Sequence, residues 1–372
     1  MNLLMLNTGS SSVRLVAFGR DAGGTLTRLA GGHYALDRHR PDALLRRFLD
    51  EHALGGMDVA AHRVVHGGER LRHPCAIDAA IEAEIERLIP LAPLHNPPAL
   101  AWIRAARAVL GAGVPQVAVF DTAFYAVLPE AARTYAIPRA LAAKHGLRRF
   151  GFHGLAHEAM WRRWRELRPE VPDGGRVISL QLGAGCSMTA IHAGRAMDTS
   201  MGFSPTEGLM MATRSGDVDP GLITYLQQHE GLTSAATEAL LNRESGLLGL
   251  AGEADMRALL AREDADAKLA LEMYCRRARK YLGAYLALLG GADAILFGGG
   301  VGENAATVRA GILAGMEWAG IALDAERNAA AAGTEARITG PNSHIQAWVI
   351  PVDEAAILAQ AAAAVIAGAT AY

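Results

Sequence analysis

Short apolar runs separated by clusters of glycine and serine dominate the start of the chain. Residues 2–8 and 13–18 are apolar runs of strand length, and the small polar stretch NTGSSS at 7–12 joins them. Apolar runs of this length that are bounded by turn-forming residues indicate strands, so we predict a hairpin here. Residues 59–66 and 116–124 are two further runs with the same character. The first third of the chain is therefore rich in predicted strands.

The same pattern begins a second time in the middle of the chain. Residues 176–198 read as an apolar strand, a glycine-rich turn and another apolar strand. A polar loop follows over 199–221, and residues 222–290 carry mostly helical patterns. Because the order of strand, small-residue turn and strand recurs, we predict two αβ halves that each open on a hairpin.

The last third of the chain combines strands with small-residue segments. Residues 294–313 predict a strand, a glycine loop and a helix, and residues 346–351 predict another strand. The alanine-rich stretch 355–367 predicts a packed helix. It is only about 13 residues long, whereas a helix that spans a membrane needs about 20.

Composition narrows the class of protein. The 372 residues are enough for two or three domains, and the net charge of −2 gives no electrostatic reason to expect nucleic acid or a membrane as a partner. The three cysteines, Cys75, Cys186 and Cys275, are too scattered for a disulfide framework or a zinc site. No secretory signal pattern precedes the first strand, so we expect a cytoplasmic protein.

Both predicted hairpin turns are suited to binding an anion. Small side chains at 7–12 and 183–187 let main-chain N–H groups approach a phosphate closely, and the serine hydroxyls add hydrogen-bond donors. Each turn taken alone is better explained as an ordinary hairpin, because glycine, serine and asparagine favour turns. Two similar turns in two halves favour the interpretation that they hold a polyphosphate.

A third glycine segment, 298–305, follows a predicted strand and precedes a helix. This is a typical context for phosphate or nucleotide binding, because main-chain N–H groups at the start of a helix attract anions. Gly300, Gly302 and Ala305 also satisfy the dinucleotide fingerprint GxGxxA, with Asp324 further along. A dehydrogenase is therefore an alternative, although it leaves both hairpins unexplained.

Several polar residues lie beside these segments. Arg63 and Arg214 are next to glycine-rich turns, where a planar guanidinium is suited to binding carboxylate or phosphate, although either could be a paired surface residue. Asp121 ends a predicted buried strand, which is where ligands bind in αβ sheets, or else it caps the next helix. His95 and His153 lie in loops rich in glycine and proline and are candidates to stabilise developing charge.

In this order along the chain, a series of long motifs resembles the acetate kinase and short-chain carboxylate kinase family. The motifs are NTGSSSVRL, HRVVHGGE, PLHNPP, VFDTAF, RRFGFHG, DTSMGFSPTEGLMMATRSGDVDPG, ADMR and FGGGVGEN. The resemblance implies an α/β class of fold, the duplicated two-domain actin-like, Hsp70-like and sugar-kinase (ribonuclease H-like) architecture with a central cleft. It implies an N-terminal domain of residues 1–150 completed by helix 354–372, and a nucleotide-binding domain of residues 151–353.

The resemblance also implies the reaction. ATP would phosphorylate a short-chain carboxylate reversibly, by direct in-line transfer with Mg²⁺ or alternatively Mn²⁺, to give ADP and the acyl phosphate. Acetate is the expected substrate and propionate the alternative. The family works as a homodimer.

The resemblance assigns roles to individual positions. The implied catalytic residues are Asp121, His153, Arg214 and Arg63. Arg63 would bind the substrate carboxylate in a small apolar pocket of Val65, Leu94, Phe152 and Pro205. Asn7 and Glu354 would hold the metal. The implied nucleotide-binding residues are Arg14, Ser10, Ser12, Gln181, Leu182, Gly183, Ala184, Gly185, Asp255, Met256, Arg257, Gly300, Val301, Gly302, Glu303 and Asn304.

The second hairpin departs from the family pattern. The family has a histidine and an asparagine where this chain has Gln181 and Ala184, and the Ala184 side chain cannot donate a hydrogen bond. This leaves an alternative function open, namely a nucleotide-binding protein of the same fold that has no catalytic activity or acts on another substrate.

Overall fold

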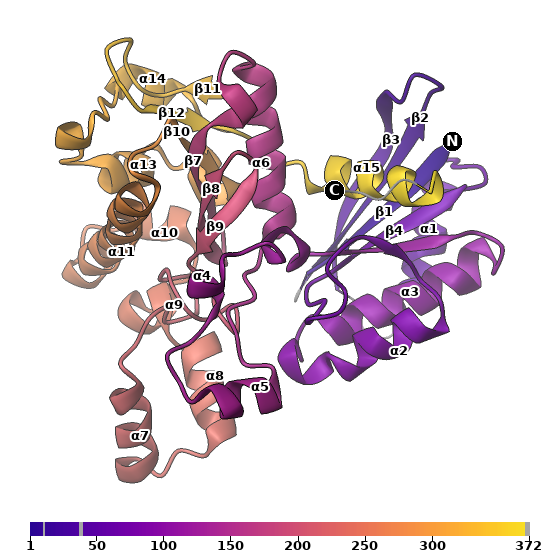
Figure 1. Cartoon of the computed structure of the whole chain (residues 1–372), viewed down its shortest axis with the longest axis horizontal. Helices are drawn as coiled ribbons and strands as arrows, with labels where there is room; N and C mark the ends of the chain where they lie inside the picture. The colour runs from indigo at the N-terminus through magenta and orange to yellow at the C-terminus, as the bar shows by residue number, and fades with distance from the viewer. Residues whose placement is uncertain (10–11, 37–39, 369–372) are drawn as a thin grey trace. The chain divides into compact units, whose positions relative to one another are not determined.

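The computed structural model describes residues 1–9, 12–36 and 40–368. It divides the chain into two compact units, and Figure 1 labels most of their helices and strands. Unit 1 comprises Met1–Ala126, His153–Leu155 and Asp353–Tyr372, and unit 2 comprises Val127–Phe152 and Ala156–Val352. The predicted position Ser10 lies outside the described residues.

The core of unit 1 is a six-stranded sheet in the order β3-β2-β1-β4-β6-β5. Strands β1, β2 and β3 form an antiparallel meander, β1, β4 and β6 run parallel to one another, and β5 is antiparallel to β6. The bounds are β1 Asn2–Thr8, β2 Ser12–Arg20, β3 Leu26–Ala35, β4 Val59–Val64, β5 Cys75–Ala76 and β6 Gln116–Phe120. The predicted first hairpin is therefore confirmed.

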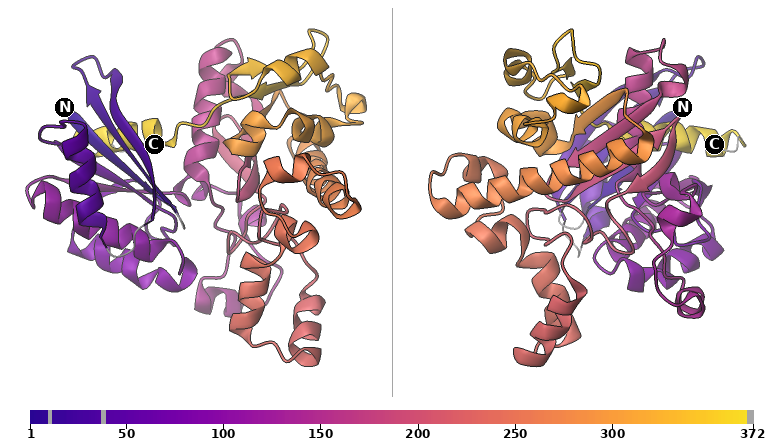
Figure 2. Two further views of the ribbon diagram at one scale, coloured as in Figure 1. Left: turned by 180° about the vertical axis from the view of Figure 1, so that it is seen from behind. Right: turned by 60° about the vertical axis from the view of Figure 1, so that its left-hand side comes forward.

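Helices cover this sheet because its strands are apolar on both faces. Leu4 and Leu6 of β1 belong to a core cluster with Phe48 and Trp102, whereas their neighbours Leu3 and Met5 alternate to the opposite face. The terminal helix α15 packs against β1, β4 and β6 and lies beside the sheet in both views of Figure 2. The helices of unit 1 are α1 Pro41–Glu51, α2 Ala79–Arg87, α3 Asn96–Leu110 and α15 Glu354–Ile366, with short 3-10 turns at Ile89–Leu91 and Ala123–Tyr125.

Unit 2 repeats the topology of unit 1. Its sheet has the order β11-β12-β10-β7-β8-β9, again with an antiparallel meander, parallel inner strands and an antiparallel edge. The bounds are β7 Arg176–Leu182, β8 Cys186–His192, β9 Arg195–Thr199, β10 Ala294–Gly298, β11 Ala336–Arg337 and β12 Gln346–Val349. The predicted duplicated α/β fold is thus confirmed. The antiparallel meander is incompatible with the mostly parallel sheet that a dehydrogenase requires.

The helices of unit 2 surround this sheet and form an additional lobe of short helices. Their bounds are α4 Glu130–Arg133, α5 Arg139–His145, α6 Gly154–Leu167, α7 Pro220–His229, α8 Ser234–Arg243, α9 Gly246–Ala251, α10 Met256–Leu260, α11 Ala265–Leu289, α12 Gly299–Asn304, α13 Ala306–Leu313 and α14 Ala325–Ala330, with 3-10 turns at Pro172–Gly174 and Glu317–Ala319. The first two residues of α6 belong to unit 1. Of the helices that the structure describes, none combines the length and apolar character needed to cross a bilayer.

A buried histidine joins α6 to the first two strands of unit 2. The Nδ1 atom of His157 lies 2.6 Å from the Ser179 hydroxyl, and its Nε2 atom lies 2.7 Å from the Ser187 hydroxyl. All three residues are fully buried. Burial lowers the pKa of His157 to about 3, so the ring is neutral and one nitrogen donates while the other accepts. This arrangement fixes the two strands that flank the turn 183–185.

Stability should fall when the pH drops from 7 to 5. Burial lowers the pKa of His62, His66 and His157 to about 3, 4 and 3, whereas each would titrate near 6.5 in the unfolded chain. Below pH 6.5 the unfolded state therefore binds protons that the folded state excludes. Each histidine should lower the free energy of unfolding by about 1.4 kcal/mol per pH unit. Urea titrations at pH 7, 6 and 5 measure this loss, and a free energy that stays constant would contradict it.

Candidate active site

In unit 1 an arginine and an aspartate meet at the ends of two parallel strands. Arg63 lies on β4, and Asp121 follows β6 directly. The strands pair with Val64 opposite Phe120, and the Asp121 N–H donates to the Val64 carbonyl at 3.0 Å. Because these strands are parallel, their carboxyl ends bring both side chains to one edge of the sheet.

The two side chains form a bidentate ion pair. Arg63 donates through Nε to Asp121 Oδ1 at 2.9 Å and through Nη2 to Oδ2 at 2.6 Å. The side chains are only 13% and 1% exposed. Burial alone would lower the pKa of Arg63, but the carboxylates of Asp121 and Glu354 outweigh it and raise that pKa, so the guanidinium stays charged. Burial raises the pKa of Asp121, and the hydrogen bonds from Arg63 oppose that rise.

Asn7 connects this pair to the terminal helix. Its Oδ1 accepts from Arg63 Nη1 at 3.1 Å, and its Nδ2 donates to Glu354 Oε2 at 2.5 Å. Asn7 is near the end of β1, and Glu354 is the first residue of α15, where the Asp353 side chain accepts from the Ala356 N–H at 3.1 Å. Residues far apart in the sequence therefore form one polar cluster, which we call the Arg63 cluster: Asn7, Arg63, Asp121 and Glu354.

The Arg63 cluster leaves part of the guanidinium available for a ligand. A guanidinium has five N–H donors, and Asp121 and Asn7 accept from three of them. Among the described residues no further acceptor is found, so one N–H on Nη1 and one on Nη2 are left. Two N–H groups on neighbouring nitrogens match the two oxygens of a carboxylate.

The implied metal position fits the chemistry of this cluster. Glu354 supplies a carboxylate, the kind of hard oxygen donor that Mg²⁺ prefers, whereas the Asn7 Oδ1 atom accepts from Arg63 and the Asn7 Nδ2 atom faces Glu354. Within the described ranges no group of three or more histidine, cysteine, aspartate or glutamate side chains could form a closed cage for a metal.

His153 occupies an unusual backbone conformation next to Asp121. Its φ of 59° is in the left-handed region, which costs energy for a residue with a side chain and is typical of functional positions. Its main-chain N–H donates to the Asp121 carboxylate. A Cβ atom at Gly154 would lie 2.1 Å from the Asp121 carbonyl oxygen, so only glycine permits α6 to begin here. The sequence motif therefore holds His153 against the Arg63 cluster.

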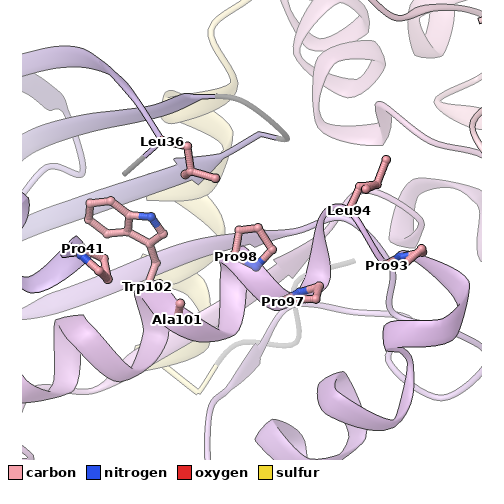
Figure 3. A pocket seen from close by; sticks show the side chains of 8 residues that line it. All are labelled: Leu36, Pro41, Pro93, Leu94, Pro97, Pro98, Ala101 and Trp102. Carbon is pink, nitrogen blue, oxygen red and sulfur yellow. The ribbon is translucent and has the colours of Figure 1, made fainter. Parts of the chain in front are cut away.

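Other predicted residues of unit 1 lie on the same elements. Arg14 is exposed on β2, directly opposite Asn7 in the register, and Ser12 begins that strand. Val65 is buried just after β4, and His95 precedes α3. Leu94 borders an apolar cavity of about 230 Å³ with Leu36, Pro41, Pro93, Pro97, Pro98, Ala101 and Trp102, as Figure 3 shows.

In unit 2 the predicted phosphate turn is a tight connection between β7 and β8. The Gly183 N–H donates to the Gly185 carbonyl at 3.1 Å, and the Ala184 carbonyl accepts from the Ala212 N–H at 3.1 Å. Gln181 has a buried Oε1 atom that no atom of the described residues donates to. Leu182 pairs with Cys186 to close the hairpin.

Arg214 lies in the polar loop before α7 and has no acidic partner among the described residues. Its Nη1 donates to the Pro205 carbonyl at 3.2 Å. Burial lowers the pKa of Arg214. A partly buried cation without a carboxylate beside it is suited to an anionic ligand.

The remaining predicted nucleotide-binding residues form two short helices. Gly300, Val301, Gly302, Glu303 and Asn304 are a helical turn, α12, where the sequence predicts a loop. Asp255 caps α10 and pairs with the exposed Arg257 at 2.7 Å, whereas Met256 is buried. Phe152 is also buried.

The sequence reasoning missed a network that holds the Arg214 loop. Asp217 accepts from the Gly208 N–H and the Tyr281 hydroxyl, both at 2.8 Å. Arg277 donates to the Gly208 carbonyl at 3.0 Å and to the Asp217 carbonyl at 3.3 Å. Arg277 and Tyr281 are four residues apart on α11, so one face of that helix supports the loop. No motif marks them, because their partners are about sixty residues away.

The chain is similar to known proteins over most of its length. Residues 42–360 match the model of the Acetokinase family. An acetate kinase of Solibacter usitatus is 49% identical over 323 residues, which cover 86% of this chain and 77% of that protein. An acetate kinase of Streptomyces avermitilis is 43% identical over 390 residues, which cover 96% of each protein.

Two solved structures are similar throughout. The acetate kinase of Porphyromonas gingivalis has a TM-score of 0.88 and 36% identity, covering 98% of this chain and 99% of that chain. A propionate kinase of Francisella tularensis has a TM-score of 0.87 and 34% identity, covering 97% of this chain and 98% of that chain. These likenesses do not favour the non-catalytic alternative. With a family match over most of its length, this chain belongs to the Acetokinase family and is a phosphotransferase of the acetate kinase type.

Proposed function

We propose that this protein transfers the γ-phosphoryl group of ATP to acetate or propionate, with Mg²⁺, and that it also catalyses the reverse reaction. The observation that carries the proposal is the Arg63 cluster, in which a charged guanidinium is held rigidly and retains two N–H donors for a carboxylate. Both substrates are proposed because the relatives include acetate kinases and a propionate kinase. We further propose a homodimer in the cytoplasm, by analogy with the family.

In the proposed reaction a carboxylate oxygen attacks the γ-phosphorus as the bond from that phosphorus to the β,γ-bridging oxygen breaks. The carboxylate is already ionised near neutral pH, so the protein needs no strong base. Its task is to position the carboxylate and to stabilise charge on the transferring group. We assign the carboxylate to Arg63 and the transferring group to Arg214 and His153.

Asp121 positions Arg63 and compensates its charge. The carboxylate of Asp121 accepts from Nε and Nη2 of Arg63. These two hydrogen bonds prevent the guanidinium from rotating. The neighbouring Asn7 accepts from Nη1. The orientation of the two remaining N–H groups is therefore set before the substrate arrives, which reduces the entropy lost on binding.

In this proposal Mg²⁺ would be held at Glu354, with Asn7 beside it. When bound, the ion neutralises charge on the phosphate oxygens of ATP. The described geometry supports Glu354 as the carboxylate ligand and Asn7 as the residue that orients it, through the hydrogen bond of 2.5 Å.

A hydroxylamine assay with a panel of acids tests the activity. With ATP and Mg²⁺, acetate and propionate should both give the hydroxamate, because a small apolar pocket separates substrates that differ by one methylene by only about 10–200-fold. A reaction without a carboxylate is the control. If acetate, propionate and butyrate all give no product, the proposed function is wrong.

Replacing Arg214 tests its role toward the transferring group. Arg214→Ala should lower kcat about tenfold to a hundredfold, because a charge-assisted hydrogen bond contributes roughly 1.5–3 kcal/mol. The KM for ATP should change much less. Steady-state kinetics with Arg139→Ala, which removes an exposed arginine of α5, provide the matched control. An unchanged kcat in Arg214→Ala would exclude this role.

Removing the metal or its proposed ligand tests the metal site. EDTA should abolish activity, and added Mg²⁺ should restore it. Glu354→Gln should raise the Mg²⁺ concentration for half-maximal rate at least about tenfold, because a neutral amide binds a hard cation far more weakly than a carboxylate does. Glu51→Gln, which changes an exposed carboxylate of α1, is the control. An identical Mg²⁺ dependence in wild type and Glu354→Gln would remove Glu354 from the site.

A further inference from the structure

A completely buried arginine lies behind the segment assigned to the nucleotide. Arg309 is on α13, which follows α12 directly, and none of its surface is exposed. It belongs to none of the motifs that carry the family resemblance. It is also one of the largest fully buried side chains of the described residues.

Every N–H donor of Arg309 is used within unit 2. Nη1 donates to the carbonyls of Gly302 and Glu303, each at 2.9 Å. Nη2 donates to the carbonyls of Asn328 at 2.7 Å and Ala331 at 3.1 Å, and Nε donates to Asn328 Oδ1 at 2.8 Å. These five contacts match the five donors of a guanidinium. A lysine, with three donors, cannot reproduce them.

The contacts join three short helices. Gly302 and Glu303 are at the end of α12, where helical carbonyls have no partner within the helix. Asn328 is on α14, and its Nδ2 also donates to the Ala306 carbonyl at the start of α13, at 2.9 Å. Arg309 and Asn328 therefore fix the end of α12 against two neighbouring helices.

The N-terminal end of α12 is held separately, by the side chain of Glu303. Its Oε1 accepts from the Gly299 N–H at 3.0 Å and from the Val352 N–H at 3.1 Å. The side chain of this predicted nucleotide-binding residue is thus engaged with the main chain. A Cβ atom at Gly300, by contrast, would meet no atom within 4 Å, so that side of α12 is open.

A buried cation is a costly way to fill a core. No acidic side chain of the described residues pairs with Arg309, and burial lowers its pKa to about 10. An apolar side chain would avoid the desolvation of a charge. What the arginine adds is geometric, since a rigid fork fixes the positions of four main-chain carbonyls at once.

We propose that Arg309 is a positioning residue for nucleotide binding, which acts by fixing the main chain of Gly302 and Glu303 so that the open side of α12 receives the nucleoside. This inference rests on the proposed function only in assigning α12 to the nucleotide. It adds a residue that contacts no ligand and sets the affinity of the site through the backbone.

Calorimetry with ADP and steady-state kinetics on the full chain test the proposal. Arg309→Lys keeps the charge but loses at least two of the five hydrogen bonds, and it should raise the Kd for ADP and the KM for ATP at least tenfold. The KM for the carboxylate should stay within twofold of wild type. A residue with a purely structural role would lower the thermal unfolding temperature without separating the two KM values.

Arg279 offers a matched control. It is a partly buried arginine of α11 that donates to the carbonyls of Gly311 and Ile312, at the end of α13 rather than to α12. Arg279→Lys should lower the unfolding temperature and leave the Kd for ADP within twofold. Asn328→Ala, which removes one acceptor of Arg309 and the bond to Ala306, gives a milder second variant should Arg309→Lys fail to fold. It should raise the Kd for ADP about threefold.

The outcomes separate the two proposals. A folded Arg309→Lys variant that binds ADP like the wild type overturns the positioning role, as does Asn328→Ala with wild-type affinity if Arg309→Lys does not fold. An Arg279→Lys variant that weakens ADP binding equally also overturns it, because the effect would then be general. If the wild type binds ADP but phosphorylates no carboxylate, the proposed function is wrong. The Kd values for ADP of the variants still test the positioning role of Arg309 in that case. A wild type that does not bind ADP contradicts both.

Discussion

The ion pair between Arg63 and Asp121 is the interaction around which unit 1 is organised. Two charges at the ends of adjacent parallel strands are removed from water, and each is tolerable only because the other is present. The pair requires β4 and β6 to be in register, His153 to present its main-chain N–H, and Gly154 to leave room for the Asp121 carbonyl. The sheet, the strained loop and the start of α6 are therefore constrained by one electrostatic contact.

The two units share a topology but differ in what lies at the ends of their parallel strands. In unit 1 the ends of the parallel strands carry charged side chains. In unit 2 the carboxyl end of β10, which corresponds to β4 in the sheet order, leads into the glycine-rich helix α12. Side chains are suited to fixing a small carboxylate, whereas exposed main chain lets a larger ligand approach closely. The two units therefore share one sheet topology, and the residues at the ends of the strands are what distinguish them.

Much of the fold and the candidate residues of unit 1 could be predicted from the sequence. The strands, the repeat and the terminal helix follow from apolar runs and the turn-forming residues that bound them. Long motifs contain Asn7, Arg63 and Asp121, and the family resemblance adds Glu354. The bond between Asn7 and Glu354 could not be predicted, because it spans 347 positions and neither residue has a periodic pattern. Residues 300–304 appear as a loop in the sequence because glycine is a poor helix former, but contacts from Arg309 and Glu303 stabilise one helical turn. Tertiary hydrogen bonds of this kind leave no local signature.

The position of α15 has a consequence for biosynthesis. This helix packs against β1, β4 and β6, yet it is made after the whole of unit 2. During synthesis one apolar face of the first sheet, with Leu3 and Met5, has no cover until residues 354–366 leave the ribosome. Unit 2 is complete before unit 1, although unit 1 begins first. Glu354 arrives with the covering helix, so one segment both closes the core of unit 1 and completes its charged cluster.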